Sequence, residues 1–294
     1  MEEARAQLGP ADAANSLELL RGLDRTAEAK IQTKDLAISS PNGPVRVRIY
    51  TPDGREGPYP AIIYFHSGGF VIGNIDAYDQ TARRLALHAG AIVLAVDYYK
   101  APEHPFPAAH EDAWAAYLWA RDQLETLGGD KERIAVLGES AGGNLAANVA
   151  IRAIAENVEA PLIQLLLYPL AGNDMNSASY RENADSIPLG KAGMMWFFKH
   201  AFSDPLAQND PRINLAGRGD LDGLPATTII TGDLDPLRSE GQIFADRLRA
   251  AGVAVNAQNM EGLGHEFFGM SKLVPGAKYA MELVVDHLKQ AFKL

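Results

Sequence analysis

GESAGG at residues 138–143 decides the fold. It follows the apolar run IAVL at 134–137 and precedes an alanine-rich segment, 144–155, with the composition of a helix. A strand, the pattern G-x-S-x-G and a helix predict a nucleophile elbow, a turn so sharp that its serine stands clear of the sheet. Glycines on both sides of the serine remove Cβ atoms that would clash there. Ser140 is the candidate nucleophile, at the start of a helix whose free N–H groups favour developing negative charge.

The pattern by itself is short. Three fixed positions at about 7% each, tried over about 300 windows, produce it by chance in roughly one chain in ten. The competing interpretation is a glycine-rich turn between a strand and a helix, with a serine that does nothing. The rest of the chain has to decide between the two.

Composition bounds the class of protein. The chain has 294 residues, of which 47% are hydrophobic and 22% charged, as is ordinary for a globular protein. A net charge of −10 argues against a nucleic acid or an anionic membrane as partner. The chain has no cysteine, which excludes disulfides, thiolate catalysis and cysteine-based zinc sites and fits a reducing compartment.

Two stretches bear on the location of the protein. Residues 1–14 are acidic and polar and contain no apolar h-region, so no secretory signal is expected. The most apolar stretch, 162–170, is nine residues long and includes Gln164, which is too short to span a bilayer. We therefore expect a cytoplasmic protein without a membrane partner.

Apolar runs alternate with helix-forming segments along most of the chain. The expected buried strands are 61–65, 91–96, 134–137, 161–168 and 226–231. In 45–50, Arg46 and Arg48 alternate with apolar residues, which is typical of an antiparallel strand with one wet face. The alternation predicts an α/β fold in a single domain, 1–294, with a mostly parallel central sheet and helices on both of its faces.

Two segments fall outside this alternation. The first, from residue 1 to about 35, is helix-prone up to about residue 32, and the second, from about 171 to 215, is polar and then aromatic. We expect the two segments to form a helical cap, with Met194, Trp196 and Phe197 in contact with the substrate. The alternatives are a frayed amphipathic arm for the first segment and the buried face of a helix for the aromatic residues.

Polar residues follow several of the expected strands, where ligands gather in sheets of this kind. HSGGF at 66–70 is one such group, and Ser140, Asp235 and His265 follow in the order Ser, Asp, His. This order predicts His265 as the base that activates the serine and Asp235 as the carboxylate that orients the histidine. Asp233 is the rival acid, but it is better placed to shape the turn.

The glycine pair Gly68-Gly69 allows two backbone N–H groups to point into a pocket. With the amide of Ala141 they are expected to form an oxyanion hole, and an ordinary flexible loop is the alternative. Phe70, the next residue, is expected to contact the substrate. Chemistry of this kind needs no metal and no cofactor.

The sequence resembles the hormone-sensitive-lipase-like branch of the α/β-hydrolases, the bacterial family IV esterases. The resemblance covers nearly the whole chain and is carried by HSGGF at 66–70, DYYKAPEHPFPAA at 97–109, GESAGG at 138–143, DPLRSEG at 235–241 and GLGHEFF at 262–268. It implies an α/β-hydrolase fold with a cap and a small-molecule substrate, a carboxylic ester with a short to medium acyl chain. It also implies Ser140, Asp235 and His265 as the catalytic triad. Homodimers are common in the family, which leaves a homodimer open here.

The chain departs from the family pattern at three places. Ser67 replaces the first glycine of the usual H-G-G-G, where its hydroxyl can change hydrogen bonding in the loop or the size of the pocket. Tyr99-Lys100 replaces the usual Arg-Leu, so the sequence does not say whether a local structural ion pair forms here. Ser239 replaces a usual aspartate.

Two other functions remain as alternatives. A hydrolase of another acyl bond, an amide or a formamide, would use the same three residues. A ligand-binding protein on the same fold, similar to the related plant hormone receptors, would lack the catalytic histidine, and His265 argues against it. A long-chain lipase is disfavoured because the chain shows no broad apolar stretch for an interface.

Overall fold

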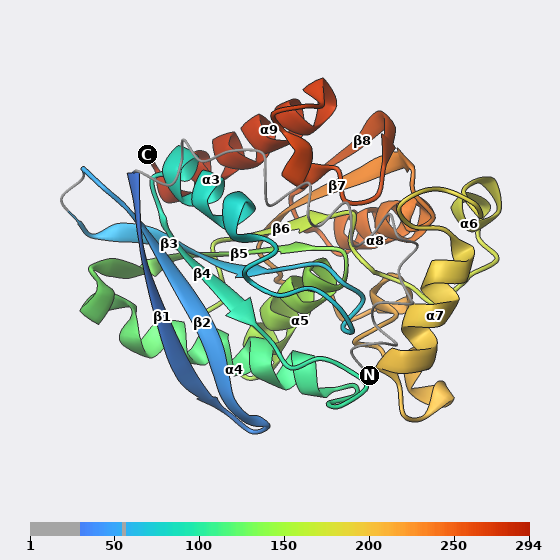
Figure 1. Cartoon of the computed structure of the whole chain (residues 1–294), viewed down its shortest axis with the longest axis horizontal. Coiled ribbons are helices and arrows are strands. Elements are labelled where there is room, and N and C mark those ends of the chain that lie inside the picture. Colours follow the sequence, from blue (N-terminus) through green and yellow to red (C-terminus); the bar gives the residue numbers. More distant parts are fainter. Residues whose placement is uncertain (1–29, 55–56) are drawn as a thin grey trace.

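The computed structural model describes residues 30–54 and 57–294, and within these ranges it contains one eight-stranded sheet (Figure 1). The strands are β1 (Ile31–Ser40), β2 (Gly43–Pro52), β3 (Tyr59–Phe65), β4 (Ile92–Asp97), β5 (Gly129–Glu139), β6 (Ile163–Leu167), β7 (Ala226–Leu234) and β8 (Val255–Gly264). Their spatial order is β1-β2-β4-β3-β5-β6-β7-β8. The pairs β1–β2 and β2–β4 are antiparallel and the other pairs are parallel, which confirms the mostly parallel sheet.

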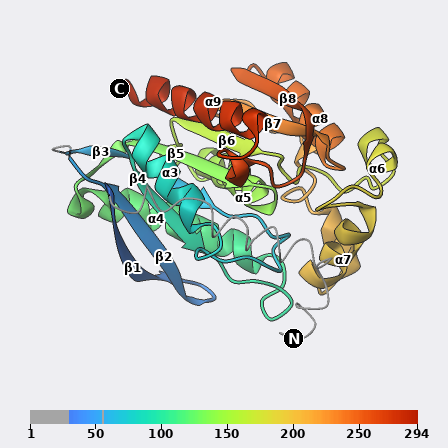
Figure 2. The ribbon, with the colours of Figure 1, turned by 45° about the horizontal axis from the view of Figure 1, so that its top comes forward.

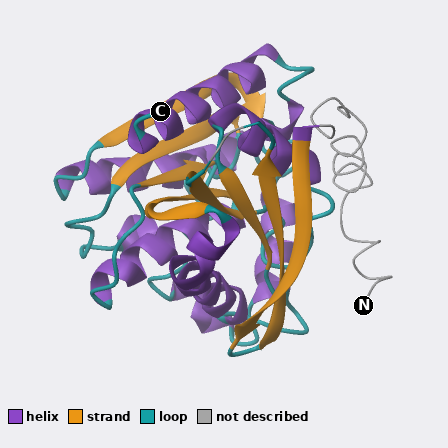
Figure 3. Ribbon diagram, turned by 90° about the vertical axis from the view of Figure 1, so that its left-hand side faces the viewer, coloured by secondary structure: helices purple, strands orange, loops and turns teal. Residues whose placement is uncertain are grey.

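Helices cover both faces of this sheet, as Figure 3 shows. The α-helices are α3 (Asp79–Ala89), α4 (Ala108–Gln123), α5 (Ala141–Ala155), α6 (Ala178–Glu182), α7 (Lys191–Ala201), α8 (Arg238–Ala250) and α9 (Pro275–Phe292). The 3₁₀ turns are η2 (Leu124–Leu127), η3 (Pro205–Asn209), η4 (Leu215–Gly217) and η5 (Phe268–Met270). None of the helices in the described ranges combines the length and apolar character that crossing a membrane requires.

The central strand β3 shows how the sheet divides the core. All seven of its residues are buried, as its continuous apolar sequence predicts. Successive side chains of a strand point to opposite faces. Ile62 and Tyr64 therefore pack with the residues of α3 and α9, whereas Ile63 and Phe65 pack with those of α4, α5 and α8.

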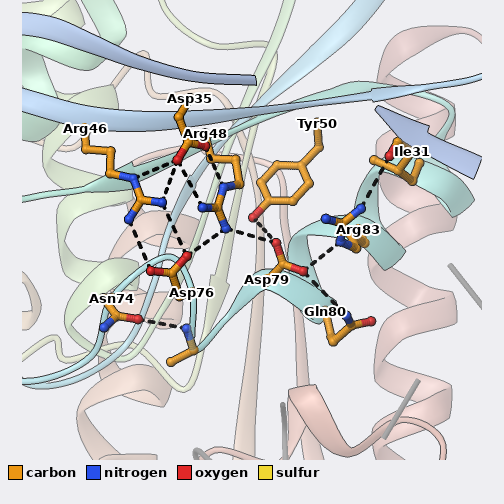
Figure 4. Close-up of polar contacts among 11 residues, drawn as sticks. Ile31, Asp35, Arg46, Arg48, Tyr50, Asn74, Asp76, Asp79, Gln80 and Arg83 are labelled. Atoms are coloured by element: carbon orange, nitrogen blue, oxygen red, sulfur yellow. Dashed lines mark hydrogen bonds and ion pairs between the residues drawn. The ribbon is translucent and has the colours of Figure 1, made fainter. Parts of the chain in front are cut away.

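The β1–β2 hairpin has one wet face, as the alternating sequence predicts. Val47 and Ile49 of β2 are buried, and Arg46 and Arg48 point from the other face toward a group of carboxylates (Figure 4). The hairpin also corrects one expectation. The segment 31–35, expected in the cap, belongs to β1, because its backbone pairs with β2 from Ile31↔Pro52 onward.

The insertion between β6 and β7 contains α6, α7, η3 and η4. Figure 2 shows α6 and α7 side by side, at the opposite end of the molecule from the β1–β2 hairpin. The other segment expected in the cap, residues 1 to about 35, lies outside the described residues up to position 29.

Candidate active site

Ser140 lies between β5 and α5 in a conformation that most residues avoid. Its φ of 56° and ψ of −116° place it in a strained region of backbone space. A Cβ atom at Gly138 would come 2.0 Å from the carbonyl oxygen of Gly142, and one at Gly142 would come 2.1 Å from that of Phe65. Only glycine fits at these two positions, which explains the residue types of the elbow.

Ser140, His265 and Asp235 form a continuous chain of hydrogen bonds. The Nε2 atom of His265 lies 2.9 Å from the Ser140 hydroxyl, and its Nδ1 atom lies 2.7 Å from a carboxylate oxygen of Asp235. All three side chains are buried, and the Leu237 amide donates to the other oxygen of Asp235. Asp233 instead pairs with Arg238 at 3.2 Å, so the structure brings the favoured aspartate, and not its rival, to the histidine.

The groups around His265 raise its pKa, which favours its role as a base. Burial lowers the pKa of His265, but the charge of Asp235 and its hydrogen bond more than offset burial, so the pKa lies above its ordinary value. The charges of Glu266 and Glu139 act in the same direction. A histidine held in this way keeps one ring tautomer and stabilises the imidazolium that forms when it accepts a proton.

The three amides expected at the oxyanion hole lie around the same cavity as Ser140 and His265. Gly68 and Gly69 have φ values of 123° and 60°, which glycine adopts without strain. Ala141 is the first residue of α5, so its N–H group has no partner inside the helix. Within the described ranges, none of the three N–H groups donates to another part of the chain.

The rest of the cavity wall is apolar and comes from several elements. It comprises Phe70, Ile72, Leu170, Pro188, Leu189, Met194, Phe197 and Phe198. Trp196, expected at the substrate, does not line the cavity and stacks on His200 with ring centroids 4.2 Å apart. Each helix residue turns by about 100°, so Trp196 points away from the face of Met194, Phe197 and Phe198. The i, i+3, i+4 spacing could have identified Phe198, which the sequence analysis missed.

The departures from the family pattern each make a specific contact. Lys100 lies 2.7 Å from Asp97, so a local ion pair exists where the replacement left it open. Ser239 exchanges hydrogen bonds with Ser179, which joins α8 to α6. Ser67 donates a hydrogen bond to the carboxylate of Glu266, the residue after His265.

Two buried carboxyl groups near the site were missed by sequence reasoning. Glu139, inside the elbow motif, accepts hydrogen bonds from the hydroxyls of Tyr64 and Tyr168. Burial and the charge of Glu266 raise the pKa of Glu139 to about 7, against the effect of the two tyrosines. Burial raises the pKa of Glu240 to about 8, although Glu240 accepts hydrogen bonds from two backbone amides at the start of the insertion.

No group of three His, Asp or Glu side chains suited to a metal ion occurs in the part of the chain that the structure describes. The side chains around Ser140 bring a hydroxyl, an imidazole and a carboxylate together beside an apolar pocket, and these are the groups that nucleophilic attack and proton transfer use.

Comparison with known proteins agrees with this geometry. A family model described as the alpha/beta hydrolase fold matches residues 62–269. Esterase LipI of Mycobacterium tuberculosis is 41% identical over 267 residues, which cover 89% of this chain and 83% of LipI. Carboxylesterase NlhH of the same organism is 39% identical over 254 residues, which cover 84% of this chain and 78% of NlhH.

Solved structures agree as well. EstE1, a thermostable carboxylesterase cloned from a metagenomic library, superposes with a TM-score of 0.91 at 33% identity, covering 99% of this chain and 97% of EstE1. The match in fold, sequence and coverage leads to one conclusion: the chain belongs to the α/β-hydrolase superfamily, within its hormone-sensitive-lipase-like branch of bacterial family IV esterases.

Proposed function

We propose that this protein hydrolyses small carboxylic esters through an acyl-enzyme intermediate on Ser140. The observation that carries the proposal is the chain of hydrogen bonds from Ser140 through His265 to Asp235, in a cavity that Gly68, Gly69 and Ala141 also line. Its relatives are named esterases and carboxylesterases, which supports a carboxylic ester hydrolase.

In the first half of the reaction, His265 removes the proton of the Ser140 hydroxyl as the oxygen attacks the ester carbon. Asp235 stabilises the imidazolium that results. The oxyanion accepts hydrogen bonds from the amides of Gly68, Gly69 and Ala141, each worth roughly 3 kcal/mol to the transition state. The tetrahedral intermediate collapses when His265 protonates the leaving alcohol.

In the second half, His265 removes a proton from water, and the hydroxide oxygen attacks the acyl carbon. The same amides stabilise the second oxyanion, and His265 returns the proton to Ser140 as the acid leaves. The same imidazole nitrogen carries both protons: the proton of Ser140 passes to the leaving alcohol, and the proton of the water passes to Ser140.

The substrate class follows from the cavity wall. Aromatic and aliphatic side chains of α7 and of the loop at 66–70 face Ser140, so an apolar acyl or alcohol group can bury its surface there. We propose short to medium acyl chains, with Met194, Phe197 and Phe70 in contact with the substrate. The segment 171–215 would act as a cap over the sheet. A cytoplasmic location stays a prediction of the sequence, and a homodimer stays open, as the resemblance to the family implies.

The test is hydrolysis of a series of p-nitrophenyl esters, from acetate to palmitate, by wild type and Ser140→Ala. We expect the highest kcat/KM on short chains and a loss of at least about 10³-fold in the variant. Ser203→Ala, an exposed serine, is the matched control and should keep full activity. Activity that survives Ser140→Ala would refute the assignment of the nucleophile.

A further inference from the structure

One pair of side chains joins the two loops that carry the proposed chemistry. Ser67 directly precedes the glycines of the oxyanion loop, and Glu266 directly follows His265. The Ser67 hydroxyl donates a hydrogen bond to the Oε1 atom of Glu266, although the two residues are 199 positions apart. Ser67 is 1% exposed, so water does not compete freely for this hydrogen bond.

The second oxygen of Glu266 is held from a different element. The Tyr78 hydroxyl, just before α3, donates to Oε2 at 3.1 Å. The Tyr78 ring stacks on His66 with centroids 5.4 Å apart, and His66 stacks on Tyr98 at 4.3 Å. The carboxylate is therefore clamped between the loop after β3 and a stack of buried rings.

The backbone conformation of Glu266 indicates that its side chain has a role that offsets the strain of this conformation. Its φ of 61° lies in the left-handed region, where glycine would be free of the strain that a glutamate carries. Ser67 likewise stands where the family pattern has glycine. Both residues line the cavity together with Ser140 and His265. Ser67 and Glu266 thus stand at positions where glycine is expected or would be unstrained, and their side chains form a hydrogen bond with each other.

The reaction requires the two loops to keep one relative position. Proton transfer depends on the distance from His265 to Ser140, and stabilisation of the oxyanion depends on where the amides of Gly68 and Gly69 point. Hydrogen bonds of this kind lose much of their effect when donor and acceptor are misplaced by about 1 Å. A direct link between the loops limits such displacement.

We propose that Ser67 and Glu266 are positioning residues, whose mutual hydrogen bond holds the oxyanion loop in register with the loop of the catalytic histidine. This inference rests on the proposed function. Neither side chain takes part in bond making or breaking, and each acts through its neighbour in the chain.

A double-mutant cycle tests the link. Ser67→Ala and Glu266→Ala, each of which removes one partner of the hydrogen bond, should each lower kcat/KM for p-nitrophenyl acetate about tenfold, mainly through kcat. The double variant should be about as active as either single variant, because both changes remove one interaction. Ser203→Ala and Glu282→Ala, at exposed residues that do not line the cavity, should leave kcat/KM unchanged singly and together.

A pH profile separates positioning from a general loss of structure. The titratable carboxyl groups that face His265 are Asp235 after β7, Glu139 on β5, Glu240 on α8 and Glu266 on its own loop. Negative charge raises the pKa of His265, so Glu266→Gln should move the acid limb of kcat/KM to lower pH. Ser67→Ala keeps the charge and should lower the rate without moving the limb.

The glycine variants Ser67→Gly and Glu266→Gly give a second cycle in which neither backbone is strained. The proposal is overturned if the losses multiply to about 100-fold in the double variants, or if the single variants keep wild-type kcat. These results can be told apart from failure of the proposed function. If the proposed function is wrong, Ser140→Ala is as active as wild type. If only the positioning role is wrong, Ser140→Ala is inactive, but the Ser67 and Glu266 variants show no coupling in the double-mutant cycle.

Discussion

Acidic side chains gather in two regions of this molecule, with opposite consequences. On the wet face of the β1–β2 hairpin, Asp35 meets Arg46 and Arg48 at 2.6 and 2.7 Å (Figure 4). Near the site, Glu139 and Glu240 are buried among hydroxyls and backbone amides. The hydrogen bond from Arg48 is the main cause that lowers the pKa of Asp35 to about 2, whereas burial raises the pKa of Glu139 to about 7 and that of Glu240 to about 8.

The difference shows that burial and the kind of partner together decide the charge state of a carboxyl group. Arginine compensates a carboxylate with a full positive charge, but a hydroxyl or an amide offers only a dipole, which does not offset the loss of water. The surface region thus keeps its charge over a wide range of pH. The buried region holds groups that change their protonation near neutral pH. Four experiments test this contrast, in order of decreasing effect.

The largest effect is expected from Glu139→Ala. The substitution leaves the buried hydroxyls of Tyr64 and Tyr168 without their acceptor and opens a cavity, at a cost of about 4 kcal/mol in the free energy of unfolding. Urea denaturation at pH 7 measures it. Glu132→Ala, exposed on the same strand, is the control and should change stability by less than about 0.5 kcal/mol. A loss below about 1 kcal/mol would mean that the tyrosines do not depend on Glu139.

Glu240→Gln should alter how stability depends on pH. The folded-state pKa is raised from 4.5 to about 8, so the folded chain binds this proton more tightly than the unfolded chain. That contribution to stability is fully present below pH 4.5 and is lost as pH rises through about 8. The glutamine can still accept from the amides, and it should make the protein about 3 kcal/mol more stable relative to wild type at pH 8 than at pH 4.5.

The measurement is a series of denaturation curves from pH 4.5 to 8 for both proteins. Asp246→Asn, an exposed aspartate on the same helix, should follow wild type. Parallel curves for wild type and Glu240→Gln would contradict the raised pKa, because they would mean that the pKa of Glu240 is the same in the folded and unfolded chain.

A smaller effect is expected at the surface region. Arg48 pairs with Asp35, Asp76 and Asp79, and its side chain is 16% exposed against 39% for Arg46. Arg48→Met should cost about 1 kcal/mol in low salt and less in 1 M salt, because salt screens such pairs. Arg46→Met is the matched comparison and should cost less. If the two variants lose the same free energy of unfolding and salt does not change the loss, the effect comes from packing and not from charge.

The smallest effect is expected from Asp35→Asn. The pKa of Asp35 is lowered from 3.8 to about 2, so its contribution is present above pH 3.8 and is lost as pH falls through about 2. Because the side chain is 41% exposed, the loss at pH 7 should stay below about 1 kcal/mol. The difference between wild type and variant should vanish at pH 2. A difference that persists there would point to a cause other than charge, and Asp286→Asn serves as the exposed control.

The mostly parallel sheet, and the polar residues that follow its strands, could be predicted from the sequence. Ser140, Asp235 and His265 each stand in a short local motif at a strand end, and parallel strands bring such ends to one edge. The beginning of β1 could not be predicted in the same way. Residues 31–35 form a strand because they pair with β2, and the helix-prone sequence before them gives no sign of that pairing.

Contacts between distant segments could not be read from the sequence. The partners of Glu139 come from β3 and β6, and the partner of Ser67 lies 199 residues away, so no local spacing reveals them. The position of Trp196 does not follow from its aromatic character, because its place on the turn of α7 directs the side chain away from the cavity.

The arrangement of the site has a consequence for how the chain folds. Ser140 and its histidine are 125 residues apart, and the elbow at the end of β5 reaches His265 only after β6, β7 and β8 have added to the sheet in turn. Contacts of such high contact order form late, since the loops between them must close first. Recovery of esterase activity during refolding should therefore lag behind recovery of helical circular dichroism. An N-terminal fragment released before β8 is synthesised would be catalytically silent, so turnover reports on completion of the whole sheet.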